Sequence, residues 1–185
     1  MKHIQTVILD RDGVINFDSP DYILSPEQWL PIPGSLEAIA RLKHAGKQVT
    51  LCSNQSALGR GMIDQAMFNR IQAKMIAQTE QAGGRFDYIA VCPHGPDDGC
   101  ACRKPLPGML LDTLNALDIQ DKSTVVMIGD SYRDVQAAHA AGIAAMLVRS
   151  GYGDADAIFE KSKVLMPNIQ SFNNLAEAVA MLLDQ

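Results

Sequence analysis

Two carboxylates separated by one residue follow directly on a short apolar run near the start of the chain. The run over 7–9 leads into Asp10-Arg11-Asp12, and Gly13 then interrupts the strand pattern. Because side chains alternate along a strand, Asp10 and Asp12 should project to the same side where the strand ends. Adjacent carboxylates repel, so such a pair indicates a bound cation or a shared proton. An exposed turn rich in Asp and Gly is the alternative interpretation.

Two further strand ends carry polar groups. The apolar run over 48–52 ends in Ser53-Asn54-Gln55-Ser56, whose hydroxyl and amide groups suit an oxyanion or phosphate cradle at the start of a helix. Simple helix capping would use the same residue types. The run over 124–128 leads into Gly129 and Asp130, and Asp134 lies one turn into the next predicted helix. This second acidic strand end repeats the pattern of the first.

Cations occur in two loops between these strand ends. Arg60 lies between Gly59 and Gly61, and Arg103-Lys104 precedes Pro105. A guanidinium suits bidentate recognition of a phosphate, which makes Arg60 a candidate partner for one. Solvated surface cations are the alternative interpretation of both loops.

Four soft ligands cluster within eleven positions, in the spacing C-x-H-x5-C-x-C. Three thiols and one imidazole fit a closed tetrahedral zinc site that leaves no position open for substrate. Such a zinc would fix the loop that leads into Arg103-Lys104, which must be positioned accurately to stabilise charge. Free cysteines or a redox pair are the alternative, and Cys52 is expected to pack as a small apolar residue. The predicted ligands are Cys92, His94, Cys100 and Cys102.

Short apolar strands alternate with amphipathic helices along the chain. This alternation predicts an α/β fold with right-handed crossovers and a doubly wound, mainly parallel sheet. We expect a single domain over 1–185, with the irregular segment between Gly13 and Pro33 folded as a loop over the site. The predicted strands are Thr6 to Leu9, Gln48 to Cys52, Tyr88 to Cys92, Thr124 to Ile128 and Ala144 to Val148. Helices are predicted from Ser35 as N-cap to a stop at Gly46, from about Asp64 to Ala82, near Pro107, near Ser131, and over Asn173 to Leu183.

The composition excludes several classes of function. A net charge of -5 argues against binding of nucleic acid, which requires a basic face. No apolar run reaches the roughly 20 residues of a membrane span, and the start of the chain does not have the pattern of a signal peptide. We therefore expect a cytoplasmic protein without a membrane partner, whose cysteines are reduced or bind metal.

Taken together, these motifs resemble those of the haloacid dehalogenase-like (HAD) phosphohydrolases. Their D-x-D-G opening is similar to Asp10-Arg11-Asp12-Gly13, their strand-end Ser/Thr to Ser53, their lysine to Lys104, and their G-D-x-x-x-D to the run over 129–134. The resemblance covers essentially the whole chain. It implies a Rossmann-like HAD fold, here without an inserted cap domain and with a zinc-stabilised loop.

The resemblance also implies roles for these residues. Asp10 would be the nucleophile that forms an aspartyl phosphate, and Asp12 the general acid and base. Mg²⁺ would be held by Asp10, the backbone carbonyl of Asp12 and Asp130, with Asp134 in support. The transferring phosphoryl oxygens would be stabilised by Ser53, Arg103 and Lys104.

Within the superfamily, a zinc loop running into C-R-K-P looks like the D-glycero-D-manno-heptose 1,7-bisphosphate 7-phosphatases and the histidinol-phosphate phosphatases. The first group is closer, through the runs over 54–61 and 103–109, although Val14 and Ser131 depart from its pattern. This resemblance implies a sugar-phosphate substrate and a role in ADP-heptose synthesis for the lipopolysaccharide core. We expect the protein to be a monomer. Other small phosphate esters remain alternatives, as does a receiver-like phosphoacceptor module. The residues expected to contact substrate are Asp18, Ser19, Asp21, Tyr22, Asn54, Gln55, Ser56 and Arg60.

Overall fold

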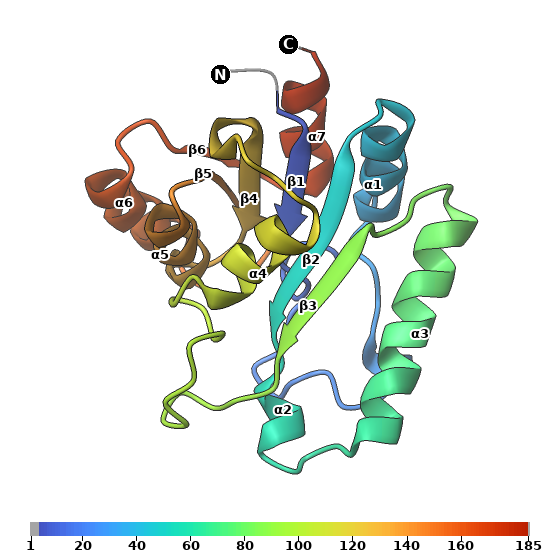
Figure 1. Cartoon of the computed structure of the whole chain (residues 1–185). Coiled ribbons are helices and arrows are strands. Elements are labelled where there is room, and N and C mark those ends of the chain that lie inside the picture. The colour runs from blue at the N-terminus through green and yellow to red at the C-terminus, as the bar shows by residue number, and fades with distance from the viewer. Residues whose placement is uncertain (1–3, 185) are drawn as a thin grey trace.

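A computed structural model describes residues 4–184 of the chain. Within this range, one six-stranded sheet has the order β3-β2-β1-β4-β5-β6, and each neighbouring pair of strands is parallel. The chain therefore winds outward in both directions from β1, which confirms the predicted doubly wound α/β fold (Figure 1). The strands are β1 (Thr6–Leu9), β2 (Gln48–Asn54), β3 (Tyr88–Cys92), β4 (Val125–Gly129), β5 (Ala144–Val148) and β6 (Gln170–Phe172).

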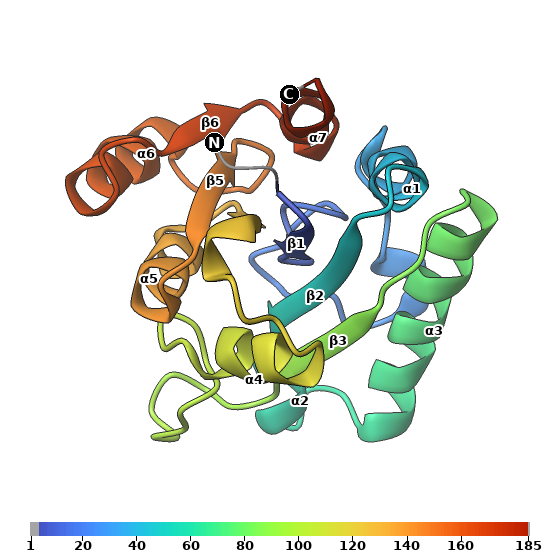
Figure 2. The ribbon, with the colours of Figure 1, turned by 45° about the horizontal axis from the view of Figure 1, so that its top comes forward.

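Helices cover both faces of the sheet (Figures 1 and 2). One face packs against α1, α3 and α7, and the other against α4, α5 and α6. No helix among residues 4–184 is long and apolar enough to span a bilayer. The helices are α1 (Ser35–His44), α2 (Ser56–Gly59), α3 (Gln65–Gln81), α4 (Gly108–Ala116), α5 (Tyr132–Ala141), α6 (Ala155–Leu165) and α7 (Leu175–Leu183), with short 3-10 turns at Pro26–Gln28 and Lys122–Thr124.

The central strands are apolar on both sides because both of their faces are covered. In β1, Val7 and Leu9 belong to the core on the α1 side, and Ile8 belongs to the core on the α5 side. All four residues of β1 are buried, as are all five of β4. This buried centre fixes the two strand ends that carry the acidic motifs.

The predicted elements agree with the structure apart from a few boundaries and three omissions. β2 continues two residues beyond the predicted end at Cys52, and β4 begins one residue later than predicted. The prediction of Ser35 as N-cap is wrong, because Gly34 caps α1 with φ +83° and the Ser35 hydroxyl donates to the carbonyl of Ile15 at 2.6 Å. The sequence patterns did not predict α2, α6 or β6 as separate elements. The chain start, Met1 to His3, lies outside the described residues.

Candidate active site

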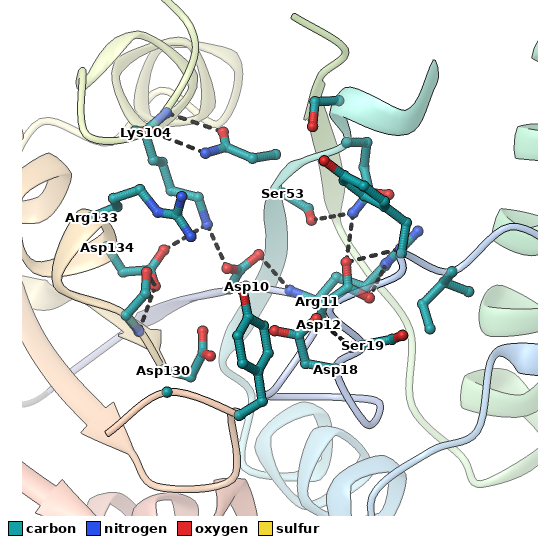
Figure 3. A pocket seen from close by; sticks show the side chains of 18 of the residues that line it. Asp10, Arg11, Asp12, Asp18, Ser19, Ser53, Lys104, Asp130, Arg133 and Asp134 are labelled. Atoms are coloured by element: carbon teal, nitrogen blue, oxygen red, sulfur yellow. Dashed lines mark hydrogen bonds and ion pairs between the residues drawn. The ribbon is translucent and has the colours of Figure 1, made fainter. Parts of the chain in front are cut away.

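A pocket of about 380 Å³ lies at the carboxyl ends of β1, β2 and β4 (Figure 3). It brings together all but one of the residues predicted to act on or to contact substrate. Asp21 is the exception, because it is exposed and does not line the pocket. The predicted residues that line it are Asp10, Asp12, Asp18, Ser19, Tyr22, Ser53, Asn54, Gln55, Ser56, Arg60, Arg103, Lys104, Asp130 and Asp134.

Lys104 is a buried cation of the pocket. Its ammonium nitrogen lies 2.9 Å from Asp10 Oδ2 and 2.6 Å from Asp134 Oδ1, and it donates to the carbonyl of Cys52 at 2.8 Å. The contact with Asp134 is an ion pair, since that oxygen receives no hydrogen bond of ordinary geometry. Burial disfavours the charged lysine, but Asp10 and Asp134 together hold the pKa of Lys104 above its ordinary value. Lys104 is therefore a fixed positive charge beside Asp10.

Three carboxylates converge at this end of the sheet. Oxygens of Asp10, Asp130 and Asp134 all lie within 4.8 Å of one another. Burial raises the pKa of Asp10 to about 6, against the opposing charge of Lys104, and burial together with the other two carboxylates raises the pKa of Asp130 well above its usual range. Burial also acts on Asp134, yet the charge of Lys104 keeps the pKa of that carboxyl low. The oxygen donors and their excess negative charge fit a hard divalent cation such as Mg²⁺.

Two glycines make room for Asp130. A Cβ atom at Gly151 would lie 2.0 Å from Asp130 Oδ2, and one at Gly13 would lie 2.6 Å from the same oxygen. Gly13 also has φ +78°, which side-chain-bearing residues rarely adopt. The Ser150 hydroxyl donates to the carbonyl of Gly13 at 2.6 Å, which joins the two glycine segments around the carboxylate.

Asp12 is held by donors on both of its oxygens. Arg11 donates through Nε to Oδ1 at 3.0 Å and through a terminal nitrogen to Oδ2 at 2.9 Å. Asn16 donates to Oδ1 and Gln55 donates to Oδ2, each at 2.8 Å. Gln55 donates from the same amide nitrogen to the hydroxyl of Ser53 at 2.8 Å. The amide nitrogen of Gln55 thus contacts two pocket residues, and its expected contact with substrate stays a prediction.

Asn54 also holds part of the pocket in place. Its amide donates to the carbonyl of Lys104 at 2.9 Å, and its carbonyl accepts from the backbone N–H of Lys104 at 3.1 Å. This reciprocal pair fixes the backbone of Lys104 against the end of β2. Ser56, the first residue of α2, is buried at the pocket wall, whereas Arg60 is exposed at its rim.

The segment after β1 forms another wall of the pocket, as its position in the sequence predicts. Asp18, Ser19 and Tyr22 line this wall. Burial raises the pKa of Asp18 to about 6, and the negative charge of Asp12 adds to the effect. The wall therefore presents a carboxyl group and a hydroxyl group toward any ligand.

The four predicted zinc ligands lie together in the structure. Their ligand atoms are all within 4.8 Å of one another, and the closest pair is Cys92 Sγ and Cys102 Sγ at 3.2 Å. His94 Nδ1 lies 3.3 Å from Cys102 Sγ and 3.6 Å from Cys92 Sγ, and Cys100 Sγ lies 3.7 Å from Cys92 Sγ. A tetrahedron with zinc–sulfur bonds of about 2.3 Å has sulfur–sulfur edges slightly below 4 Å. The cluster is thus of the right size and donor type for zinc.

Several pocket residues were not identified from the sequence. Arg133 and Ser131 line the pocket from the start of α5, and Tyr152 lines it from the turn after β5. Arg133 stands directly before Asp134, so its position inside the second acidic motif was a usable signal. Tyr152 follows Gly151, and no motif in the surrounding sequence marks either residue as part of a site. Arg11 carried no signal beyond its place between the two aspartates.

The strand order and the pocket together define the class of this protein. A receiver-like module would have the order 2-1-3-4-5, in which the winding reverses between β1 and β3. Here the order is 3-2-1-4-5-6, and the D-x-D pair, the strand-end serine, the lysine and the second acidic motif meet at one edge. This combination is that of a HAD-type hydrolase, and a HAD-hydrolase-like family model matches residues 101–178.

Comparison with proteins of known sequence and structure identifies the family within this class. The chain is 53% identical over 150 residues to D-glycero-beta-D-manno-heptose-1,7-bisphosphate 7-phosphatase of Bordetella bronchiseptica, covering 81% of this chain and 83% of the relative. It is 43% identical to the Pseudomonas aeruginosa protein of that name, covering 96% and 97%. The crystal structure of the B. bronchiseptica D,D-heptose 1,7-bisphosphate phosphatase with magnesium and phosphate superposes with a TM-score of 0.91 at 46% identity, over 98% of this chain and 99% of that one. The chain belongs to the D-glycero-beta-D-manno-heptose-1,7-bisphosphate 7-phosphatase family.

Proposed function

We propose that this enzyme hydrolyses the 7-phosphate of D-glycero-β-D-manno-heptose 1,7-bisphosphate with the help of Mg²⁺. The observation that carries the proposal is the buried Lys104 between Asp10 and Asp134 at a strand end, in a chain so similar to phosphatases of this name. The reaction would contribute to ADP-heptose synthesis for the lipopolysaccharide core.

The converging oxygen donors fit magnesium. Asp10, Asp130 and the backbone carbonyl of Asp12 would hold the ion, and Asp134 would support the site through its contacts with Lys104 and Ser131. When bound, the cation supplies charge neutralisation that lets an anionic nucleophile approach an anionic ester. The related crystal structure with magnesium and phosphate supports this part of the proposal.

Hydrolysis would proceed in two steps at phosphorus. A carboxylate oxygen of Asp10 attacks the phosphorus atom, the bond to the sugar oxygen breaks, and Asp12 gives that oxygen its proton. In the second step Asp12 removes a proton from water, the water oxygen attacks the aspartyl phosphate, and inorganic phosphate leaves. Asp10 is regenerated as a carboxylate, so the cycle closes.

The remaining polar groups would bind the phosphoryl oxygens and the sugar. Lys104, with the Ser53 hydroxyl and Arg103, would stabilise the transferring group, since phosphoryl transfer depends mainly on positioning and charge. Arg60, exposed at the pocket rim, is a partner for the distal phosphate. Sugar hydroxyls would meet Asp18 and Ser19 on the opposite wall.

The decisive test combines one variant with a choice of substrates. Asp10→Asn should remove turnover while the variant keeps its fold by circular dichroism, and Asp21→Asn, which lies outside the pocket, should retain activity. The wild type should hydrolyse the β-bisphosphate faster than the α-anomer and histidinol phosphate. Activity of Asp10→Asn, or equal rates on all three esters, would contradict the proposal.

We also propose that Cys92, His94, Cys100 and Cys102 bind a structural zinc. Their donor types and separations support it, because four protein ligands close a tetrahedral site. Elemental analysis should find one zinc per chain in the wild type and in the control Cys52→Ala, whose sulfur lies outside the cluster and contacts Thr113. Cys100→Ser should lose the metal and unfold at a lower temperature. Full zinc content in Cys100→Ser would exclude this ligand set.

A further inference from the structure

Arg11 is the residue between the two catalytic aspartates, and its side chain is almost fully enclosed. It is 1% exposed and belongs to the largest buried side chains of the described chain. Its fork of Nε and a terminal nitrogen takes one donor to each oxygen of Asp12, at 3.0 and 2.9 Å. The other terminal nitrogen points to Gln72 Oε1 on α3, at 3.5 Å. The guanidinium thus joins the Asp12 carboxylate to the helix layer behind the pocket.

The local backbone explains how neighbouring side chains can meet. In a continuing strand, residues 11 and 12 would point to opposite faces. The chain instead turns immediately after β1, and the carbonyl of Arg11 accepts hydrogen bonds from the backbone N–H groups of Val14, Ile15 and Asn16. This tight turn brings the Arg11 side chain alongside the Asp12 carboxylate (Figure 3). The Arg11 guanidinium therefore makes its shortest side-chain hydrogen bonds to the neighbouring Asp12 carboxylate.

Fold stability alone is a poor reason for such a pair. Withdrawing the Arg11 guanidinium from water costs free energy, and solvent screens the Asp12 side chain, which is 22% exposed, so the pair contributes little to the free energy of unfolding. A planar fork does, however, fix both the position and the plane of a carboxylate, which a lysine cannot do. Asn16 and Gln55 each add one further donor, so each oxygen of Asp12 accepts two hydrogen bonds.

We propose that Arg11 is a positioning residue that aligns Asp12 for proton transfer to the leaving oxygen. This inference rests on the proposed function, in which Asp12 donates its proton as the bond between phosphorus and the ester oxygen breaks. A sugar alkoxide is a poor leaving group and needs that proton. A nitrophenolate is stable as an anion and leaves without it, so its departure does not require a well-aligned Asp12.

The test compares two substrates in the same variants. We choose Arg11→Met, which removes the fork, and Arg11→Lys, which keeps a buried cation without the fork. The control is Lys74→Met, which also removes a cation that anchors α3, here to the carbonyls of Pro26 and Trp29, with no contact to Asp12. The measured quantity is kcat/KM on heptose bisphosphate and on 2,4-dinitrophenyl phosphate, because kcat/KM covers only the steps up to aspartyl phosphate formation.

General acid catalysis contributes about 10²–10⁴-fold, so a misaligned acid should lower kcat/KM on the sugar phosphate by about 10–100-fold. On the aryl phosphate the loss should stay within about 3-fold of wild type, since that ester does not use the acid. Lys74→Met should leave the ratio between the two substrates unchanged. Arg11→Lys keeps the inference testable if Arg11→Met fails to fold, and it should lower the sugar-to-aryl ratio at least about 5-fold.

Equal losses on both substrates in both Arg11 variants would overturn the positioning role and leave Arg11 as a structural residue. Failure of the proposed function would look different. In that case the wild type itself would not turn over the sugar phosphate, or Asp10→Asn would remain active, whatever the Arg11 variants did.

Discussion

Replacing Lys104 by methionine tests the electrostatics of the pocket most directly. The Lys104 side chain is 1% exposed and compensates the charges of Asp10 and Asp134, whose side chains are 14% and 2% exposed. Removing one partner of a buried ion pair costs about 3–5 kcal/mol, because the remaining charge has neither water nor a counter-ion. For a domain of this size, 1 kcal/mol lowers the melting temperature by about 2–4 °C. We therefore expect Lys104→Met to lower it by about 6–20 °C in buffer containing a chelator.

The assay is urea and thermal unfolding followed by circular dichroism. Adding Asp134→Asn to Lys104→Met should restore about 1–3 kcal/mol, since it removes one of the uncompensated buried charges. The control is Lys163→Met, whose partner Glu160 lies in an exposed pair that contributes little. A Lys104→Met protein within about 1 kcal/mol of wild type would refute the reasoning, because it would show that the carboxylates need no cation.

Two further predictions concern residues at and beyond the pocket. Burial raises the pKa of Asp87, but the hydrogen bond from Lys43 outweighs burial and the pKa is lowered. The interaction between Asp87 and Lys43 therefore stabilises the fold fully above the ordinary carboxyl pKa of 3.8, and this stabilisation is lost as the pH falls through the lowered pKa. Lys43→Met should therefore unfold at lower urea than wild type at neutral pH, and the gap should close in acid; a gap that stays constant would argue against this pair. Gly151→Ala should raise the Mg²⁺ concentration for half-maximal activity at least about 10-fold, because a Cβ 2.0 Å from Asp130 Oδ2 must displace that carboxylate. Gly46→Ala, whose added Cβ meets nothing within 4 Å, should not change it.

The sequence predicted most of the pocket because its residues stand at strand ends. Apolar runs such as 7–9 and 124–128 are recognisable, and parallel strands bring their carboxyl ends to one edge of the sheet. The positions of Asp10 and Asp130 therefore follow from the pairing of β1 with β4 and do not depend on the conformation of the loops. Residues on the short edge strand β6 and on α6 had weaker patterns, since β6 has only three residues and α6 buries only Ser162.

What the sequence could not provide was the direction of individual side chains. Asp21 and Tyr22 are neighbours in one irregular segment, yet only Tyr22 lines the pocket. Tyr22 has φ +66°, a turn conformation that no local pattern announced. Gln55 has the residue type of a ligand contact, but its amide protons are used within the protein. Such choices depend on tertiary partners, which spacing along the chain does not encode.

Arg103 and Lys104 are neighbours in the sequence, but different contacts hold them in place. Arg103 donates to the carbonyl of His94 at 2.8 Å, so its position depends on the cluster of Cys92, His94, Cys100 and Cys102. Lys104 is held independently, by two hydrogen bonds between its backbone and Asn54 and by its buried ion pairs. Loss of zinc should therefore free Arg103 while Lys104 keeps its place beside Asp10. In Cys100→Ser we expect KM to rise about 10-fold, the loss of one charge-assisted contact, with kcat within about 3-fold of wild type. A fall in kcat at constant KM would show instead that the metal positions Lys104.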